Sequence, residues 1–243
     1  MKFRGKTAVV TGSAGKGMGR SIALALAREG ANVVINYRKS KEEAELIVDY
    51  IKSKFVEACA IKADIFNKEE CYLLIDETIK RYQSIDILII NPGAGWNMES
   101  IDKLNASESL NDIKYEIAPI YYLFPKVLPI MYKQKWGRII GISLIQDPPS
   151  PSYSYNVAKK ARTNALLAAS YQAWENNVTI NIVSPGPVGH IDQFDKAIEL
   201  NNKLNAWKNR KNITPQDIAE TILYLCSDEA SYISGSEINF RWN

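Results

Sequence analysis

Short apolar runs alternate along the chain with segments in which apolar residues recur at helical spacing. The runs "KTAVVTG" and "NVVINY" are rich in β-branched residues, and "GRSIALALAREG" between them carries alanine and leucine at helical spacing and ends in glycine. This order predicts a strand, a helix and a second strand. The same patterns predict a helix at "EEAELIVDYIKSKF", a strand at "EACAIKAD" and a helix at "KEECYLLIDETIKRY".

The alternation continues through the second half of the chain. "IDILIIN" is almost wholly apolar, which is typical of a strand buried on both faces. Two later strands are predicted at "GRIIGIS" and "VTINIVSPG", with a long helix across roughly 157–175 between them and a late helix at "DIAETILYLCS". These segments show no internal repeat and no linker-like stretch, so they predict one α/β domain over residues 1–243. We expect a doubly wound (Rossmann) parallel sheet with helices on both faces, and ligands beyond the carboxyl ends of its strands.

A polar segment at about 190–213 follows one of the predicted strand ends. It carries only a weak helical pattern. Two interpretations remain open for it, a mobile lid over a substrate pocket or an ordinary surface helix.

The composition narrows the class of protein. Of the 243 residues, 46% are hydrophobic and 23% are charged, as in a typical globular protein. The net charge is only +3 and the basic residues are scattered, so nucleic-acid binding is not expected. The N-terminal apolar run is too short for a signal sequence, and no run of about 18 apolar residues occurs. We therefore expect a cytoplasmic protein without a membrane partner.

The cysteines and the histidine argue against a metal site. Cys59, Cys71 and Cys226 have no CxxC spacing, so we expect buried free thiols rather than disulfides or a zinc cluster. His190 is the only histidine, which excludes a multi-histidine metal site and any Ser-His-Asp triad that does not use it. We expect proton transfer to rely on another type of residue.

A glycine-rich segment lies between the first predicted strand and the first predicted helix. In "TGSAGKGMGRSIA", residues 11–23, the glycines permit tight turns and close approach of a pyrophosphate. The N-terminus of the helix adds N–H donors and the positive end of a helix dipole. Glycines in such a turn can be purely structural, but a strand with a polar end about twenty residues later favours dinucleotide binding.

The end of that next strand bears on the choice of cofactor. A carboxylate there would accept the ribose hydroxyls of NAD, but the sequence reads Asn36, Tyr37, Arg38 and Lys39. Arg38 offers a fork of donors that matches phosphate oxygens, and Ser40 adds a hydroxyl. The pattern favours NADP over NAD; the alternative is that these are solvated loop residues.

Tyr155 and Lys159 stand four positions apart at the start of a predicted helix. Residues at this spacing share one helix face, and an ammonium near a phenol stabilises the phenolate. An unperturbed tyrosine has a pKa of about 10, so it needs such help to act as a base near neutral pH. The spacing is also common on helix surfaces, so its meaning depends on the rest of the pattern.

Six markers in order give the chain a resemblance to the short-chain dehydrogenase/reductase family. They are the glycine turn at 11–19, Ala63 with Asp64, "INPG" at 90–93, Tyr155 with Lys159, "SPGPV" at 184–188 and "SDEASYISGSEINF" near the C-terminus. The resemblance runs from about residue 3 to residue 239 and is closest in pattern to 3-oxoacyl-acyl-carrier-protein reductases. It implies hydride transfer between a nicotinamide cofactor and a small-molecule carbonyl or secondary alcohol, and a homo-oligomer, either dimer or tetramer.

The resemblance also implies roles for individual residues. Tyr155 would donate or accept the proton, and Lys159 would bind the nicotinamide ribose and assist the tyrosine. The cofactor-binding residues expected are Gly12, Ser13, Gly17, Met18, Gly19, Tyr37, Arg38, Asp64, Ile65, Asn91, Gly93, Tyr155, Lys159, Pro185, Gly186 and Val188. Of these, the resemblance implies Asp64 and Ile65 at the adenine, Asn91 and Gly93 at the ribose, and Pro185, Gly186 and Val188 at the nicotinamide.

Several positions depart from the family pattern. Four residues instead of three separate the first two glycines of the turn, and the inserted Lys16 either reaches a phosphate or marks a different loop path. Pro92 stiffens the turn in "INPG" and removes an N–H donor. Glu116 stands where the family has an asparagine that holds a water for proton relay. A carboxylate there could hold a water, relay a proton or repel negative charge.

The serine that orients the substrate in the family is missing. Alignment on "GRIIGIS" puts Leu144 at that position, and leucine cannot donate a hydrogen bond. Ser143 is the candidate catalytic hydroxyl, although adjacent strand side chains point to opposite faces and a bulge would be needed to turn it inward. The open alternatives are contacts from Ser152, Ser154 or Gln146, or no side-chain replacement.

Other functions therefore stay open beside an NADP-dependent oxidoreductase. Loss of one donor to a developing oxyanion costs about 3 to 4 kcal/mol, so slow turnover would survive it. One alternative is a cofactor-binding protein with little or no turnover, in a regulatory or structural role. Another is a dehydratase or isomerase in which Glu116 is a general base.

Overall fold

The computed structural model describes residues 1–243 except 94, 96–99, 147–149, 203–212 and 242–243. The described residues form a sheet of seven parallel strands in the order β3-β2-β1-β4-β5-β6-β7. The chain builds the sheet outward from β1 to β3, returns to the centre and continues from β4 to β7. This reversal is the doubly wound topology predicted from the sequence, and it places a ligand crevice at the carboxyl ends of the central strands.

The bounds of the elements are as follows. The strands are β1 (Thr7–Val10), β2 (Asn32–Tyr37), β3 (Ala58–Lys62), β4 (Ile87–Ile90), β5 (Gly137–Ile142), β6 (Val178–Pro185) and β7 (Glu237–Phe240). The α-helices are α1 (Met18–Arg28), α2 (Lys41–Lys54), α3 (Lys68–Tyr82), α4 (Ala106–Gln134), α5 (Tyr153–Trp174), α6 (Phe194–Asn202) and α7 (Pro215–Cys226). Two short 3₁₀ helices are η1 (Ile101–Lys103) and η2 (Asp228–Ala230).

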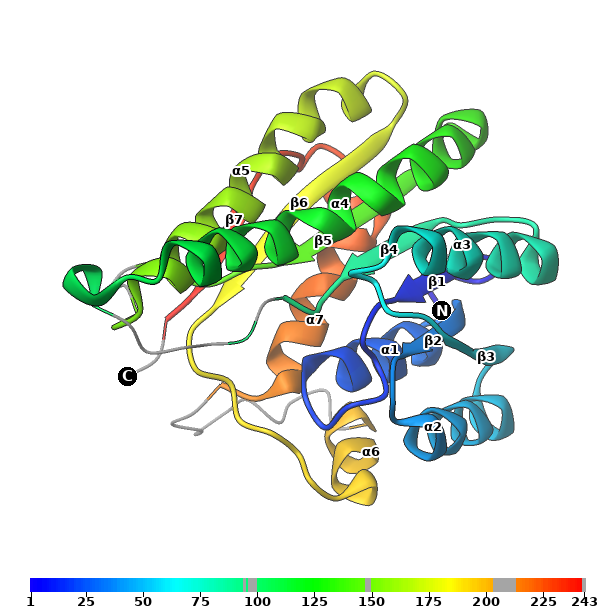
Figure 1. Ribbon diagram of the computed structural model, residues 1–243. Coiled ribbons are helices and arrows are strands. Elements are labelled where there is room, and N and C mark those ends of the chain that lie inside the picture. Colours follow the sequence, from blue (N-terminus) through cyan, green and yellow to red (C-terminus); the bar gives the residue numbers. More distant parts are fainter. Residues whose placement is uncertain (94, 96–99, 147–149, 203–212, 242–243) are drawn as a thin grey trace.

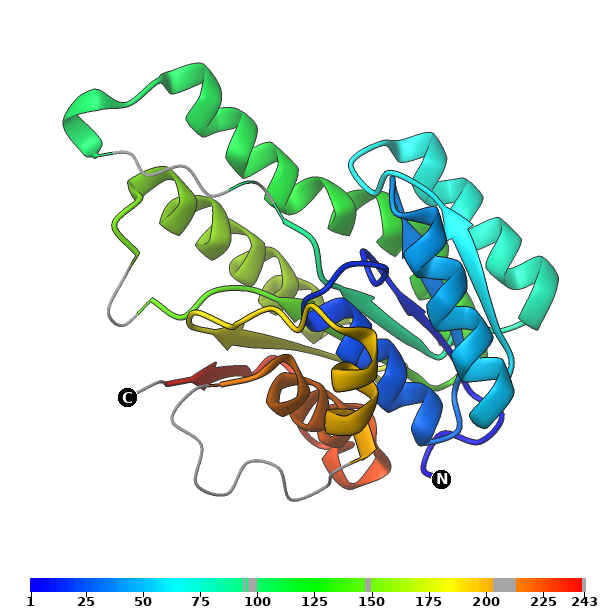
Figure 2. The same cartoon turned by 90° about the horizontal axis from the view of Figure 1, so that it is seen from below.

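Helices cover both faces of the sheet. Figure 1 shows α3, α4 and α5 on one side and α1, α2, α6 and α7 on the other, and Figure 2 shows α6 beside α1 and α7. Successive strand side chains alternate between the two apolar layers: Val10 packs with residues of α1 and α7, whereas Val9 packs with residues of α3 and α4. Because both faces are covered, central strands such as β4 are buried along their whole length.

All of the strands and helices predicted from the sequence are present. Helix α3 matches its predicted segment residue for residue, and it begins where the Asn67 side chain accepts a hydrogen bond from Glu70 N at 3.0 Å. Helix α5 begins at Tyr153, a turn earlier than its pattern indicated, which places Tyr155 within the helix. Helix α6 lies in the predicted lid segment 190–213, of which residues 203–212 lie outside the described residues.

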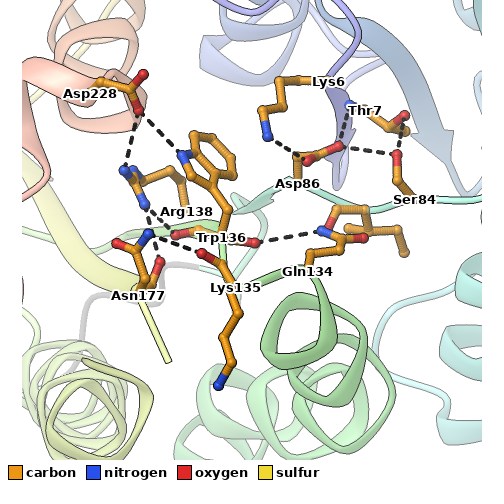
Figure 3. Close-up of polar contacts among 12 residues, drawn as sticks. Lys6, Thr7, Ser84, Asp86, Gln134, Lys135, Trp136, Arg138, Asn177 and Asp228 are labelled. Atoms are coloured by element: carbon orange, nitrogen blue, oxygen red, sulfur yellow. Dashed lines mark hydrogen bonds and ion pairs between the residues drawn. The ribbon is translucent and has the colours of Figure 1, made fainter. Parts of the chain in front are cut away.

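Polar side chains stabilise the edge of the sheet at which the strands begin (Figure 3). The buried Asp86 carboxylate accepts hydrogen bonds from Thr7 N at 2.8 Å and Ser84 Oγ at 3.1 Å, and it pairs with Lys6 Nζ at 3.0 Å. The Lys6 ammonium also lies 3.9 Å from the centroid of the Trp136 ring. These contacts join the starts of β1, β4 and β5, at the edge opposite the carboxyl ends of the strands.

Two further findings concern the described part of the chain. Within it, no helix is long and apolar enough to cross a membrane, and no group of three or more His, Cys, Asp or Glu residues could hold a metal ion. Cys59, Cys71 and Cys226 are free and buried, as predicted.

Candidate active site

The glycine turn after β1 forms a cradle lined by backbone. Gly12 has a φ of +58°, and a Cβ added to it would lie 2.2 Å from Cγ of Pro92. A Cβ on Gly19 would lie 2.6 Å from the carbonyl oxygen of Gly12. Gly17 precedes α1, and no side chain caps the helix, so none competes with an anion for the N–H groups of the first turn. With Ser13 and Met18 in the same turn, this cradle fits the diphosphate of a dinucleotide.

Hydrogen bonds from buried side chains connect the glycine turn to the ends of the neighbouring strands. Thr11 Oγ1 accepts a hydrogen bond from Asn91 N at 3.0 Å. Asn36 Oδ1 accepts one from Gly12 N at 2.9 Å, and Asn36 Nδ2 donates to the Ala63 carbonyl at 2.9 Å. Asn36 is 2% exposed. At a strand end where a carboxylate would bind the ribose of NAD, this buried amide instead hydrogen-bonds to the backbone. The ends of β1, β2 and β4 are thereby held in one register.

The inserted residue of the glycine turn contacts the start of the predicted lid segment. Lys16 Nζ pairs with Asp192 Oδ1 at 3.3 Å, and the Lys16 carbonyl accepts a hydrogen bond from Ile191 N at 3.0 Å. Lys16 therefore contacts the segment that leads from β6 to α6.

The residues expected at the adenosine lie beyond the ends of β2 and β3. Arg38 Nη1 and Asp64 Oδ2 are 3.4 Å apart. A cavity of about 300 Å³ is lined by Tyr37, Arg38 and the glycine turn, and another of about 270 Å³ joins Arg38 and Asp64 to Gly93. The Ile65 side chain is only 3% exposed and packs in the apolar layer with residues of α3.

Helix α5 brings Tyr155 and Lys159 together at the same edge of the sheet. The Ser152 side chain caps the helix by accepting a hydrogen bond from Tyr155 N at 3.4 Å. Lys159 Nζ lies 5.3 Å from the centroid of the Tyr155 ring, and the lysine side chain is 7% exposed. The spacing of four residues thus places phenol and ammonium on one helix face, as predicted, with Lys159 buried and Tyr155 partly buried.

Glu116 forms an ion pair with each of two cations on α5. Its Oε1 lies 2.9 Å from Lys159 Nζ, and its Oε2 lies 2.9 Å from Arg162 Nη1. The carboxylate and the guanidinium are both fully buried. The ion pair with Lys159 is a contact of Glu116 that the sequence did not predict.

The environment shifts the pKa values of all three ionisable groups. Burial raises the pKa of Tyr155 to about 12; the Glu116 carboxylate adds to this shift and Arg162 opposes it. Burial lowers the pKa of Lys159 to about 8, against the attraction of Glu116. Burial acts to raise the pKa of Glu116, but the charges of Lys159 and Arg162 outweigh it and hold that pKa below its usual value. Near neutral pH the site therefore holds a phenol, an ammonium and a carboxylate.

The Ser143 hydroxyl makes its hydrogen bonds to α5. Ser143 Oγ donates to the Lys159 carbonyl at 3.1 Å and lies 2.7 Å from Thr163 Oγ1. Of the alternatives, Ser152 caps α5 and Ser154 Oγ lies 2.7 Å from another serine hydroxyl. Gln146 differs, because its Nε2 is buried with no hydrogen-bond partner among the described residues.

The residues expected at the nicotinamide lie where β6 ends. Pro185 is the last residue of β6, and its carbonyl accepts a hydrogen bond from Ile145 N at 3.2 Å. Gly186 is buried and Val188 is partly buried against the first apolar layer. Gly93, which follows β4, lies against the catalytic lysine, since a Cβ on it would lie 2.5 Å from Lys159 Nζ.

Arg162 is the site residue that sequence reasoning missed. It stands three residues after Lys159 and seven after Tyr155, which is the spacing of a single helix face. This spacing, which places Arg162 on the same helix face as Tyr155 and Lys159, is the sequence signal that could have identified it.

A comparison with protein families and known proteins agrees with this geometry. The family model described as "Enoyl-(Acyl carrier protein) reductase" matches residues 12–240. The chain belongs to the short-chain dehydrogenase/reductase family. This confirms the resemblance drawn from the six sequence markers, and the protein is an oxidoreductase of this family.

Relatives in the family cover nearly the whole chain. The protein named "3-oxoacyl-[acyl-carrier-protein] reductase FabG" of Staphylococcus epidermidis is 34% identical over 239 residues, 96% of each chain. "Tropinone reductase-like 3" of Erythroxylum coca is 32% identical and covers 98% of this chain and 92% of its own length.

Solved structures of the family share the fold. A 7α-hydroxysteroid dehydrogenase complexed with NADH and 7-oxo glycochenodeoxycholic acid has a TM-score of 0.84 and 26% identity, covering 98% of this chain and 94% of its own. NAD⁺-bound xylitol dehydrogenase has a TM-score of 0.85 at 20% identity and covers both chains completely.

Proposed function

We propose that this protein is an NADP(H)-dependent oxidoreductase that interconverts a small-molecule carbonyl compound and the corresponding secondary alcohol, with Tyr155 as the acid/base. The observation that carries the proposal is the pair of the partly buried Tyr155 and the buried Lys159 beside the glycine cradle. Lys159 Nζ lies 5.3 Å from the Tyr155 ring, and the Lys159 ammonium is also in the ion pair with Glu116.

The chain's own residues supply proton transfer and positioning. When bound, the nicotinamide supplies or accepts the hydride. In the reductive direction Tyr155 donates its phenolic proton to the carbonyl oxygen, and its raised pKa of about 12 keeps that proton in place near neutral pH. The Lys159 ammonium then stabilises the phenolate that forms. In the oxidative direction the phenolate takes the proton back from the alcohol.

The preference for NADP rests on Arg38. Its guanidinium is half-exposed at the cavity beyond β2, where Lys39 and Ser40 also line the wall. A 2′-phosphate there would meet a fork of N–H donors. NAD remains the competing cofactor, because related dehydrogenase structures are described with NADH and NAD⁺.

The substrate oxygen needs a donor beside Tyr155. Ser143 remains the donor predicted from the sequence, and Gln146 is the competing one because its buried Nε2 has no partner among the described residues. Pro185, Gly186 and Val188 would line the nicotinamide side of the same crevice.

A non-redox reaction with Glu116 as general base fits the site less well. Both carboxylate oxygens of Glu116 lie 2.9 Å from cationic nitrogens, and its pKa is held below the usual value. A carboxylate stabilised in this way is a weak base.

A homo-oligomer is part of the proposal. A groove of about 560 Å³ runs between α4 and α5, lined mainly by apolar side chains, and Tyr121 beside it is 65% exposed. A second copy of the chain would cover this face, and sedimentation analysis tests the expectation of a dimer or tetramer.

Turnover of NADPH tests the proposal directly. We expect NADPH oxidation with members of a ketone panel that includes a 3-oxoacyl thioester, and a loss of roughly a hundredfold to ten-thousandfold in kcat for Tyr155→Phe. Tyr153→Phe is the matched control, since Tyr153 is 45% exposed on the same helix. Calorimetric NADPH binding that survives in Tyr155→Phe separates chemistry from binding. Tight NADPH binding with no turnover on any substrate would instead favour a cofactor-binding protein.

A further inference from the structure

Glu116 brings a buried negative charge next to the catalytic pair. Its carboxylate is fully buried, and charge removed from water in this way is stable only when it is paired. Oε1 pairs with Lys159 and Oε2 pairs with Arg162, each at 2.9 Å. The carboxylate thus carries two ion pairs at once.

The charges of this cluster do not cancel. One carboxylate and two cations leave one net positive charge beside the Tyr155 phenol. With Lys159 alone as its partner, the carboxylate would offset the ammonium, and little positive charge would remain to stabilise a phenolate. Arg162 supplies the second positive charge.

The position of Arg162 is fixed by the strand end. Its Nη1 donates to the carbonyl of Pro92 at 2.6 Å, and its Nη2 donates to the carbonyl of Ile90. The same Nη1 reaches Glu116 Oε2 at 2.9 Å. The planar fork therefore joins the end of β4 to α4 and holds the carboxylate in one orientation.

We propose that Arg162 is a positioning residue for the reaction: it offsets the Glu116 carboxylate, so that Lys159 keeps a positive charge available to Tyr155, and it fixes the carboxylate that holds Lys159. This inference rests on the proposed function of the site. Glu116 and Arg162 form a compensated pair: removal of one of the two charges lowers activity, whereas removal of both largely preserves it.

The charged groups around Tyr155 come from two helices. Among the described residues, the charges found to act on or lie beside the Tyr155 ring are Glu116 on α4 and Lys159 and Arg162 on α5. The residues at the ends of β4 and β5 nearest to this cluster, Asn91 and Ser143, are neutral. Beyond β2 and β3, Arg38 and Asp64 pair with each other.

Three variants test the compensation. Arg162→Met removes one positive charge, Glu116→Gln removes the negative charge, and the double variant restores the net charge of the parent. We expect Arg162→Met to shift the pH midpoint of alcohol oxidation upward and Glu116→Gln to shift it downward, by about one unit or tenfold in ionised tyrosine. The double variant returns toward the parent midpoint, and its kcat/KM exceeds the product of the single effects by about tenfold or more.

A second measurement does not depend on turnover. Nuclear magnetic resonance of isotope-labelled lysine, assigned with Lys159→Met, reports the titration of the Lys159 ammonium. Arg162 lowers and Glu116 raises the pKa of Lys159, so the two single variants are expected to move it in opposite directions. If the parent protein has no turnover, the proposed function fails, whereas these shifts still decide the role of Arg162.

A purely structural role for Arg162 predicts a different result. Arg138→Met is the matched control, since Arg138 is a buried arginine near the opposite edge of the sheet and is expected to change stability without moving either titration. If Arg162→Met alone does not fold, Glu116→Gln is compared with the double variant instead, and the difference between those two proteins reports the effect of Arg162. The proposal would be overturned if both single variants shifted the pH midpoint, or the pKa of Lys159, in the same direction. It would also be overturned if the pH midpoint of the double variant were no closer to that of the parent than the midpoint of Glu116→Gln.

Discussion

A Cβ added to Gly93 would lie 2.2 Å from Oε1 of Glu116. It would also lie 2.5 Å from Lys159 Nζ. The backbone that follows β4 therefore lies directly against the ion pair that holds the catalytic lysine, and no side chain fits at position 93. The strand end thereby helps to set where the ammonium lies relative to Tyr155.

Gly93→Ala is expected to displace the ion pair and to lower kcat by roughly a hundredfold, because a shift of about 1 Å in a catalytic group costs that much. Gly189→Ala is the control, since a Cβ at Gly189 meets nothing within 4 Å. Steady-state kinetics with NADPH compare the two variants. Equal losses in both would show that the close approach at Gly93 has no bearing on catalysis.

The pH dependence of reduction is expected to follow Lys159. Burial lowers the pKa of Lys159 to about 8, so the ammonium is present below that pH and is lost as the pH rises through it. Tyr155, with a pKa raised to about 12, keeps its proton throughout this range. Reductase kcat/KM should therefore be constant below about pH 8 and fall above it. A profile that stays level well beyond this pH would exclude Lys159 as the titrating group.

The fold could be predicted from the sequence because most of its elements have strong apolar patterns. Helix α4 had no such pattern, because Pro119, Pro125 and Pro129 lie inside it and each removes a backbone donor. Packing of its apolar face between α3 and α5 outweighs these losses, and that packing exists only in the folded chain. Strand β7 was likewise missed, since its four residues are not fully buried and lack the continuous apolar run of the equally short β1 and β4.

Site residues could be predicted where residue type and spacing along the chain indicate a catalytic role, as for Tyr155 and Lys159. The partners of Glu116 could not, because they depend on how α4 and α5 pack together. Arg162 acts through the carboxylate it reaches across that helix interface, a contact that no local pattern encodes.

The hydroxyl that orients the substrate can be identified with a pair of variants. Ser143 donates to the Lys159 carbonyl on α5, so Ser143→Ala is expected to lower the free energy of unfolding by about 1 kcal/mol and to change kcat by less than about threefold. Gln146→Leu is expected to lower kcat by roughly a hundredfold, because Nε2 is a buried donor without a partner among the described residues.

Kinetics and thermal unfolding of both variants distinguish the two residues. A hundredfold loss of kcat in Ser143→Ala, with Gln146→Leu unaffected, would assign the orienting role to Ser143, as the sequence predicts. Losses in neither variant would mean that the substrate oxygen is held without either side chain.

Cofactor preference is expected to depend on Arg38. Arg38→Leu should raise KM for NADPH by about tenfold or more and change KM for NADH by much less, since only the former brings a 2′-phosphate to the guanidinium. Lys54→Leu, at the far end of α2, removes the same charge away from the cavity and serves as the control. A parent protein that uses NADH and NADPH equally well would contradict the preference.

The network at the starts of the strands is expected to act on stability alone. In Asp86→Ala the N–H of Thr7 and the hydroxyl of Ser84 lose a buried acceptor and Lys6 loses its ion pair, which should lower the free energy of unfolding by about 3 kcal/mol. Asp76→Ala is the matched control, because Asp76 is 60% exposed in its ion pair with Lys126 and such pairs contribute at most about 1 kcal/mol.

Urea unfolding measures both losses, and calorimetry measures NADPH affinity in the same samples. Asp86 lies where β4 begins and the glycine cradle lies where β1 ends, so NADPH affinity should be the same in the parent and in both variants (Figure 3). Equal stability losses in the two variants would show that the Asp86 hydrogen bonds add nothing to an exposed ion pair. A loss of NADPH affinity confined to Asp86→Ala would mean that the starts of the strands also fix the geometry of their carboxyl ends.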